Sequence, residues 1–388
     1  MLAWEDTYGH TVARGVGFVG TISGEVSMRR CTRCTTPESY PGVTFDEEGV
    51  CSLCSAVTEV RTGGLGLDAL GERIRSLGRG GPYDCLIPLS GGKDSTYILY
   101  SAVHDLGLVP LAVNYDSGSQ SEEGRANVAN ACDALGVRLV IVRPDPDIQR
   151  KMLREILEIS RELGCYTRTC TSCELMLRNS TVRVAREHNV PVVLWGSASA
   201  ESVEEQEYED YRYGRSVRAV LASKLQTLRR LRLTPAKVAR LLPHIFRYTI
   251  LSVRQRIQMK VPLSCVLNPY GFMPFPESDP TIIHYFDYTS WEPGENTQLL
   301  EEKLGWRHPP GRDSRFDCLL YAFVEHRQLK LTGISDSGAI DCSFVRQGKM
   351  TKEEALERER ATRERVVDEC QALVDELGVK RLPIDLPS

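Results

Sequence analysis

Residues 83–95 read YDCLIPLSGGKDS, an apolar run followed at once by two glycines and several polar side chains. The run predicts a buried strand, and residues 95–107, which end in Gly107, predict a helix. A strand, a glycine turn and a helix start together form an anion site. The reason is that the first N–H groups of a helix lack partners and lie at the positive end of its dipole.

The residues of this turn suit an oxyanion. Gly91 and Gly92 let the backbone approach a ligand closely. Lys93 adds a positive charge, Asp94 can bind Mg²⁺ or cap the turn, and the two serines offer hydroxyl groups. The turn is not a Walker A loop, because G-x-x-x-x-G-K followed by Ser or Thr is absent. An ordinary glycine turn is the alternative, and the complete S-G-G-K-D-S string favours the anion site.

The chain beyond this turn continues to alternate strands and helices. Further strands are predicted at residues 109–116, 137–143 and 189–196. A helix is predicted between Ser121, which opens it, and Gly136, which closes it. Alternation at these lengths predicts an α/β fold, with a doubly wound parallel sheet that carries helices on both faces.

The SGGxDS string resembles the PP-loop of the ATP pyrophosphatase superfamily (adenine nucleotide alpha hydrolase-like), which includes GMP synthetase, argininosuccinate synthetase and tRNA thiolation enzymes. The resemblance implies that ATP is cleaved between its α- and β-phosphates and that AMP is attached to a carbonyl oxygen of the substrate. It also implies the ATP-binding residues, which are Ser90, Gly91, Gly92, Lys93, Asp94, Ser95, Asn114, Tyr115, Gly196 and Ser197. Of these, Lys93 and Asp94 would also take part in catalysis. All contacts would lie at the carboxyl ends of parallel strands.

Thirteen cysteines include three CxxC pairs. In a large chain without a recognisable secretory signal, such pairs indicate metal or redox sites in a reducing compartment, and we expect a cytoplasmic protein. The spacing Cys31-x2-Cys34-x16-Cys51-x2-Cys54 is typical of four-thiolate zinc sites. A closed site of this kind leaves no position for a substrate, so it predicts a structural zinc ribbon.

Three segments resemble the N-acetyl sugar amidotransferases of bacterial surface-polysaccharide synthesis. Residues 29–54 resemble the zinc ribbon of that family, and residues 301–318 and 341–357 resemble its closing region. This resemblance implies that nitrogen replaces the activated oxygen, with ammonia supplied by a glutaminase partner.

The third pair, Cys170 and Cys173, stands at a predicted helix start, where a thiolate is stabilised. It resembles the CxxC of PP-loop sulfurtransferases that thiolate tRNA. In one subgroup the pair and a distant third cysteine hold a [4Fe-4S] cluster, and Cys265 lies at a similar separation here, with Cys165, Cys318 and Cys342 as competitors. A second zinc site, a redox dithiol and buried thiols remain open alternatives. The core is predicted to take up Cys85, Cys132 and Cys370.

The charges are distributed unevenly although the net charge is only -4. Residues 201–210 carry six acids, whereas residues 211–276 carry 13 Lys and Arg and no acid. An RNA backbone is one partner for this basic segment. Pairing with the acidic run, neutralisation of ATP or a sugar nucleotide, and a membrane surface are the other interpretations. No apolar run approaches the ~18–20 residues that a membrane span needs.

The expected order along the chain is as follows: a poorly ordered extension at 1–27, a zinc ribbon at 28–60, a PP-loop ATP-binding domain at 65–200, a basic helical insertion at 201–261 broken by Pro243, the completion of the catalytic domain at 262–350, and a C-terminal helix and tail at 351–388.

Two enzyme functions fit these patterns. The first is an ATP-dependent sulfurtransferase acting on a small metabolite or tRNA, with Mg²⁺ and a sulfur donor, in which Cys170 and Cys173 carry or coordinate the sulfur. The second is the amidotransferase, in which that pair is structural. A zinc- and ATP-binding regulatory module without turnover is a third interpretation, against which the intact loop argues. A homodimer is compatible with all three.

Overall fold

The structure is a computed structural model of the 388-residue chain, and it describes residues 29–40, 43–56, 65–78, 81–163, 170–196, 234–261, 280–289, 295–309 and 315–377. Five strands form one sheet in the order β3-β2-β1-β4-β5, and every pairing is parallel. The strands are β1 (Cys85–Pro88), β2 (Pro110–Tyr115), β3 (Arg138–Val142), β4 (Val192–Trp195) and β5 (Thr281–His284). The predicted parallel sheet is therefore confirmed. The short strand β5 is an addition that the sequence pattern did not predict.

Helices cover both faces of the sheet, as a doubly wound fold requires. One face packs against α2 (Leu67–Ser76), α3 (Lys93–His104), α4 (Glu122–Leu135) and α11 (Glu295–Leu304). The other face packs against α6 (Cys170–Glu187) and the residues just after α9 (Pro235–Gln258). Along β1 the side chains alternate between these two cores, with Ile87 in the first and Leu86 in the second.

The predicted ends of α4 are confirmed by its caps. The Ser121 hydroxyl accepts a hydrogen bond of 2.9 Å from the Gly124 amide, and Gly136 adopts a left-handed conformation with φ +63°. A hydroxyl N-cap satisfies one of the orphan amides of the first turn, and glycine ends a helix without steric strain.

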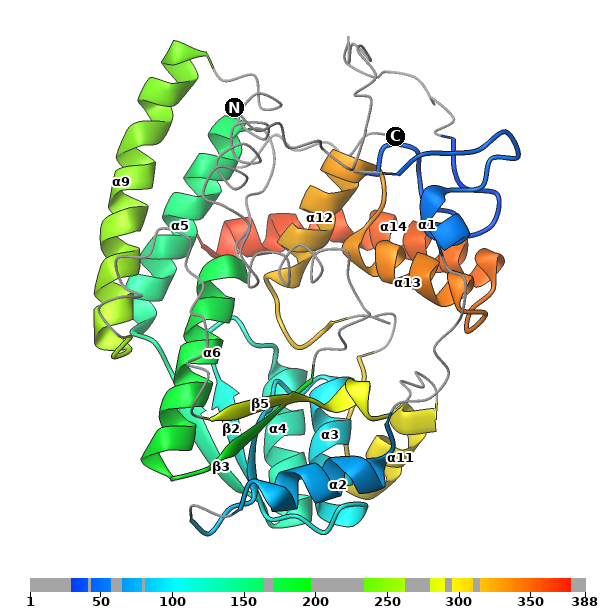
Figure 1. Ribbon diagram of the computed structural model, residues 1–388. Helices are drawn as coiled ribbons and strands as arrows, with labels where there is room; N and C mark the ends of the chain where they lie inside the picture. Colours follow the sequence, from blue (N-terminus) through cyan, green and yellow to red (C-terminus); the bar gives the residue numbers. More distant parts are fainter. Residues whose placement is uncertain are drawn as a thin grey trace, which may run out of the picture.

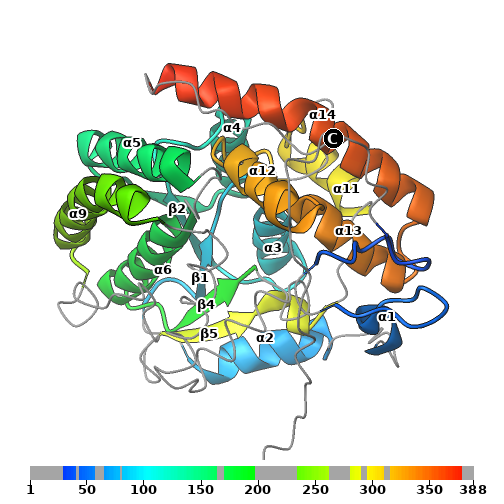
Figure 2. The same cartoon turned by 90° about the horizontal axis from the view of Figure 1, so that it is seen from above.

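A separate group of helices lies beyond one edge of the sheet (Figure 1). It consists of α12 (Tyr321–Thr332), α13 (Asp336–Arg346) and α14 (Lys352–Glu376), and α5 (Pro146–Leu163) packs against it through an apolar cluster. The predicted charged helix near the C-terminus is α14, which begins with a capping box between Thr351 and Glu354. Seen from above, α12 and α13 lie over the region of α3, and α1 (Ser52–Ala56) lies beside them (Figure 2).

The expected break at Pro243 is wrong, because α9 runs through this residue without interruption. Pro243 has no N–H to donate to the carbonyl of Ala239. Both residues are exposed, so water can take the hydrogen bond of that carbonyl. The remainder of the predicted insertion, residues 201–233, lies outside the described residues, as does the extension at 1–27.

Three of the single cysteines lie in the core, as predicted: Cys85, Cys132 and Cys370 are all buried. Within the described part of the chain, no helix has the length and apolar character that crossing a membrane demands.

Candidate functional site

The predicted anion loop lies at the point where the strand order reverses. From β1 the chain winds outward through β2 and β3, and then returns to place β4 on the opposite side of β1. In open α/β sheets, ligands bind in the crevice at the carboxyl ends of the strands at this switch point. Residues 89–92 connect the end of β1 to α3 at that position, and Gly196 follows the neighbouring strand β4.

Gly91 occupies a position of the loop that only glycine fits. Its φ is +85°, a region that L side chains rarely adopt. A Cβ atom at this position would lie 2.1 Å from the carbonyl oxygen of Gly124, at the start of α4. The loop therefore packs directly against the backbone of a second helix start.

Four successive carbonyl groups of the loop are hydrogen-bonded from the body of the protein. Asn114 Nδ2 donates to Leu89 O at 2.7 Å, and Gln120 Nε2 donates to Ser90 O at 2.7 Å. The other donors bind the two glycine carbonyls. Trp306 Nε1 (3.0 Å) and Asn127 Nδ2 (3.1 Å) donate to Gly91 O, and Thr96 Oγ1 donates to Gly92 O at 2.8 Å. These hydrogen bonds engage the carbonyl oxygens of the loop, which are the atoms that would otherwise repel an anion.

The start of α3 has no side-chain cap. Its N-cap is Gly92, and no side chain caps this end of the helix. The Ser95 hydroxyl lies 3.2 Å from the Ser90 hydroxyl, so the two hydroxyls sit together beside this first turn. An uncapped helix start flanked by hydroxyl groups is suited to bind a phosphate or diphosphate group.

Asp317 reaches the same loop from the segment before α12. Its carboxylate is hydrogen-bonded by Ser90, and a Cβ on Gly92 would lie 3.3 Å from its Oδ2 atom. Burial raises the pKa of Asp317. The bond from Ser90 and the charge of Arg315 act in the opposite direction, while Asp94 adds to the rise. The sequence analysis did not single out Asp317, although it lies in the segment 301–318 that carries a family resemblance.

The start of α6, which carries the third CxxC pair, lies near the carboxyl end of β2. Tyr115 is the last residue of β2, and α6 begins at Cys170. Burial raises the pKa of Tyr115, and the neighbouring charges of Cys173 and Asp116 raise it further. Cys173 therefore lies near the end of β2. It is half-buried, in the first turn of α6, where the helix dipole stabilises a thiolate.

Two of the predicted site residues have a structural partner that the sequence did not indicate. Asn114 is buried, and its carboxamide binds the loop rather than facing outward. A Cβ on Gly196 would lie 3.1 Å from Ile98, so this glycine packs closely on α3. Ser197 and Cys265 lie outside the described residues, and of Cys170 only the backbone is described.

The other long-range partners of the loop were also missed from the sequence: Gln120, Asn127 and Trp306. Asn127 binds both the N–H (2.8 Å) and the carbonyl (2.9 Å) of Arg307, which fixes Trp306 beside the loop. Polar residues within a helix and a tryptophan in a loop carry no local signal of such contacts. In the sequence, only the family resemblance of residues 301–318 indicated that the segment around Trp306 contributes to the site.

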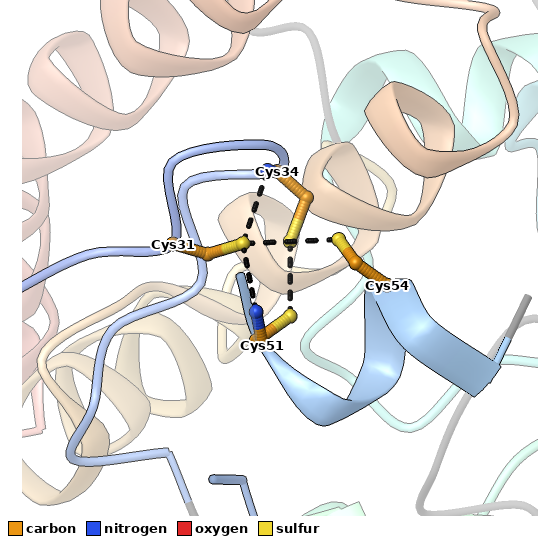
Figure 3. A group of neighbouring side chains, drawn as sticks. All are labelled: Cys31, Cys34, Cys51 and Cys54. Atoms are coloured by element: carbon orange, nitrogen blue, oxygen red, sulfur yellow. Dashed lines mark hydrogen bonds between the residues drawn. The ribbon is translucent and has the colours of Figure 1, made fainter. Parts of the chain in front are cut away.

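The four N-terminal cysteines come together as the spacing predicted. Their sulfur atoms all lie within 4.8 Å of one another, and all four residues are buried (Figure 3). The Sγ atoms of Cys31 and Cys54 are 3.8 Å apart, and those of Cys34 and Cys51 are 3.5 Å apart. Sulfurs bound tetrahedrally at ~2.3 Å from a metal ion lie about 3.8 Å apart. The four thiols can therefore hold one tetrahedral ion.

Backbone and side-chain donors surround these sulfurs. Cys31 Sγ accepts from the amide of Cys51 at 3.2 Å, and Cys34 Sγ accepts from Arg346 at 3.4 Å. A hydrogen bond from Cys342 lowers the pKa of Cys34 well below its usual value. Donors of this kind favour the thiolate form, which is the form that binds metal ions.

The segment with the four cysteines, residues 29–56, rests on the C-terminal helices. Arg30 donates to Gly333 O at 3.1 Å, and Lys352 donates to Thr32 O at 3.1 Å. The sulfurs also share an apolar cluster with Ile334 and Cys342. This segment therefore contacts the C-terminal end of α12, whose N-terminal end follows the segment that carries Asp317.

Taken together, the fold and the loop define an α/β protein whose loop at the switch point of a parallel sheet is suited to bind an anion. No family model matches the chain, and no curated protein is similar to it. Among solved structures, it is similar to the U34-tRNA thiolase NcsA from Methanococcus maripaludis with its [4Fe-4S] cluster. The identity is 14%, the alignment covers 93% of each chain, and the TM-score is 0.32.

Proposed function

We propose that the chain is an ATP-dependent, adenylating enzyme of the PP-loop type, which replaces a carbonyl or amide oxygen of its substrate with sulfur. The observation that carries this proposal is the loop at residues 89–95. The loop carbonyls accept hydrogen bonds from Asn114, Gln120 and Trp306. The start of α3 has no side-chain cap, and the loop lies at the switch point of the sheet.

The loop supports the first step, in which the substrate oxygen attacks the α-phosphorus of ATP. The bond between the α-phosphorus and the bridging oxygen breaks, and diphosphate leaves. Diphosphate carries the negative charge that develops in this step, so a helix start that binds it stabilises the transition state. Ser90, Lys93 and Ser95 would bind it as donors.

The position of Cys173 supports sulfur as the second nucleophile. In this step sulfide from the sulfur donor adds to the activated carbon, AMP leaves with the original oxygen, and loss of a proton gives the C=S product; Cys173 would position the sulfide. Cys173 is half-buried, lies at a helix start, and is close to the carboxyl end of β2, and the loop follows the carboxyl end of the neighbouring strand β1. A thiol in such surroundings is reactive, whereas a fully buried structural thiol is inert.

Metal ions would have two separate places. The four buried cysteines fit Zn²⁺ in number, donor type and spacing, and zinc there would stabilise the fold without touching substrate. A cluster held by Cys170, Cys173 and Cys265 would supply a sulfur-binding iron. That donor set lies only partly within the described residues.

Product analysis tests the proposed function. The full-length protein is incubated with ATP, labelled sulfide or labelled ammonia, and two acceptor pools: bulk tRNA and a small-metabolite extract. We expect AMP and diphosphate, with labelled sulfur in the acceptor by mass spectrometry. ADP as the product would overturn the adenylating chemistry. Labelled nitrogen in the acceptor, with no sulfur, would overturn the sulfur step and establish amidotransfer instead.

A further inference from the structure

One side of α9 is apolar and exposed. In the described part of the chain, eleven large apolar side chains are exposed, and six of them lie on this helix: Val238, Leu242, Ile245, Phe246, Ile250 and Ile257. The first four follow the i, i+4, i+7, i+8 pattern of one helix side, which the last two continue. Single exposed apolar residues are ordinary on a protein surface, whereas a contiguous set marks an interaction site. We call these six residues the α9 apolar face.

The opposite side of α9 packs on the protein. Leu241, Ser252 and Gln255 are buried there, and α5 is the neighbouring helix. Both views show α9 at the rim of the molecule beside α5 (Figures 1 and 2). The α9 apolar face points away from the protein, with Phe246 67% and Leu242 58% exposed. These side chains are therefore available to a partner.

A line of arginines borders the α9 apolar face. Arg240, Arg247 and Arg254 are spaced seven residues apart, which places them one above another along the helix. Arg240 Nε donates to Glu162 of α5 at 2.6 Å. Arg247 Nε donates to Glu155 of α5 at 2.8 Å, while Arg254 is exposed. The whole helix carries five Lys and Arg and no Asp or Glu, so none of its own side chains repels an anionic surface.

This combination suits the surface of an anionic lipid bilayer. A helix with apolar residues on one side and cations beside them lies in the plane of the membrane interface, where the apolar side chains enter the acyl chains and the cations meet phosphate groups. RNA would bind the cations and stack a base on Phe246, but the aliphatic side chains would stay in water. A second copy would bring a second set of cations to the interface, with no acid on α9 to pair them.

The sequence before α9 carries the same charge as the helix. Residues 211–234 contain seven Lys and Arg and no acid, so their charge repels the cations of α9, whereas an anionic surface attracts both segments. The six acids at 201–210 would neutralise cations without giving the aliphatic side chains an apolar partner. Charge therefore favours a lipid surface over these two segments as the partner of the α9 apolar face.

We propose that α9 docks the protein on an anionic lipid bilayer, with Leu242 and Phe246 among the acyl chains and Arg254 at the phosphate groups. The contact involves one leaflet only, because no helix in the described part of the chain is long and apolar enough to cross a membrane. Met259 and Val261, just after α9, pack against the sheet, so docking holds the sheet close to the membrane surface. This proposal does not depend on the proposed function.

Vesicle flotation tests the proposal. The full-length, zinc-loaded protein is mixed at low ionic strength with vesicles of phosphatidylglycerol and phosphatidylcholine in equal parts, or of phosphatidylcholine alone. We expect stronger binding to the anionic vesicles, because electrostatic attraction adds to apolar insertion. Leu242→Ser combined with Phe246→Ser weakens this binding about tenfold or more, since each change removes an inserted apolar side chain. Leu331→Ser, which removes an exposed leucine of α12, is the matched control and leaves binding unchanged.

A second pair of variants tests the charge. We expect Arg254→Gln to weaken binding to the anionic vesicles about fivefold, which is the effect of one cation close to a charged membrane. Lys303→Gln is its control, because Lys303 is exposed on α11, which lies away from α9 in both views (Figures 1 and 2). It leaves binding unchanged, since salt screens distant charges.

Insertion is measured separately and needs no loss of binding. In Phe246→Trp, the new indole replaces an exposed ring of the α9 apolar face. We expect its fluorescence, taken as the difference from wild type, to shift to the blue with anionic vesicles and to be quenched by lipids brominated in their acyl chains. An indole that stays in water, with neither shift nor quenching, contradicts insertion.

Three further results overturn the proposal. The first is wild-type protein that does not float with anionic vesicles. The second is a Leu242→Ser and Phe246→Ser double variant that floats as well as wild type. The third is wild-type protein that ignores vesicles but loses either tRNA binding with Arg254→Gln or self-association with the double variant, which would assign the face to RNA or to a second copy. Unchanged urea unfolding midpoints show that the variants are folded.

Discussion

The chain uses the CxxC motif in two surroundings that differ in burial and in the groups around the sulfur atoms. In the four-cysteine site, the sulfurs of Cys31, Cys34, Cys51 and Cys54 are buried and bonded by backbone amides, by Arg346 and by one another. In the other surroundings, Cys173 is half-buried in the first turn of α6, near the carboxyl end of β2.

The difference shows that the motif alone does not set the chemistry of a thiol. Four thiolates around one tetrahedral ion leave no coordination position for a substrate, and the zinc proposed here would stabilise the structure. A half-exposed thiol at a helix start keeps its nucleophilic character.

Removing a ligand of the buried site has the largest effect. We expect Cys51→Ser to lose its zinc and to lower the free energy of unfolding by about 4 kcal/mol or more, because binding of a structural zinc is coupled to folding. Metal content per chain and urea unfolding measure the two effects. Cys132→Ala, which removes a buried thiol elsewhere, is the control and retains the zinc. Full zinc content in Cys51→Ser would show that the site is not a four-ligand site.

The loop depends on one glycine. We expect Gly91→Ala to cost about 3 kcal/mol and to abolish AMP formation, because its Cβ would collide with the Gly124 carbonyl. Gly118→Ala is the matched control, with φ +81° and no atom within 4 Å of the added Cβ. It pays only for its backbone conformation, about 1 kcal/mol. Both variants keep their zinc, and equal AMP formation by the two would contradict the packing argument.

Cys342 tests how complete the four-cysteine site is. Its thiol lies beside Cys34 and 3.2 Å from the Thr35 hydroxyl, but four sulfurs already surround the centre of the site. We expect Cys342→Ala to keep its zinc and to lose about 1 kcal/mol of stability, which is the cost of a lost buried contact. Loss of zinc in this variant would make Cys342 a ligand.

Cys173 has the smallest effect on stability and a large one on sulfur transfer. We expect Cys173→Ala to change the free energy of unfolding by no more than about 0.5 kcal/mol. Its sulfur-containing product falls about a hundredfold while AMP formation stays within about threefold of wild type. Cys370→Ala, which removes a thiol buried in α14, is the control and retains the product. A Cys173→Ala variant with full sulfur transfer would contradict the reactive role of the pair.

The basic segment shows where the sequence was misleading. Its mixed apolar and basic pattern predicts a helix, and α9 is that helix. The proline within the pattern also predicts a break, which α9 does not contain. The penalty for a proline depends on whether the carbonyl one turn earlier can reach water. At an exposed position such as Ala239 it can, and this exposure is a property of the folded chain.

The sequence by itself determined the local features of this protein. Apolar runs predicted four of the five strands, hydroxyl and glycine residues predicted the ends of α4, and cysteine spacing predicted the four-thiol site. These features depend on neighbouring residues, so a short window of sequence contains their causes.

Only the tertiary structure decided what surrounds the loop. The donors to its carbonyls come from 25 residues away in Asn114 and from 215 residues away in Trp306, and Asp317 arrives by pairing with the segment before α4. Such contacts form because the sheet and the C-terminal helices bring distant segments together. Asn and Asp are mostly exposed in proteins and Trp is mostly buried, but neither tendency specifies which distant group a side chain contacts, so these partners have no local signature.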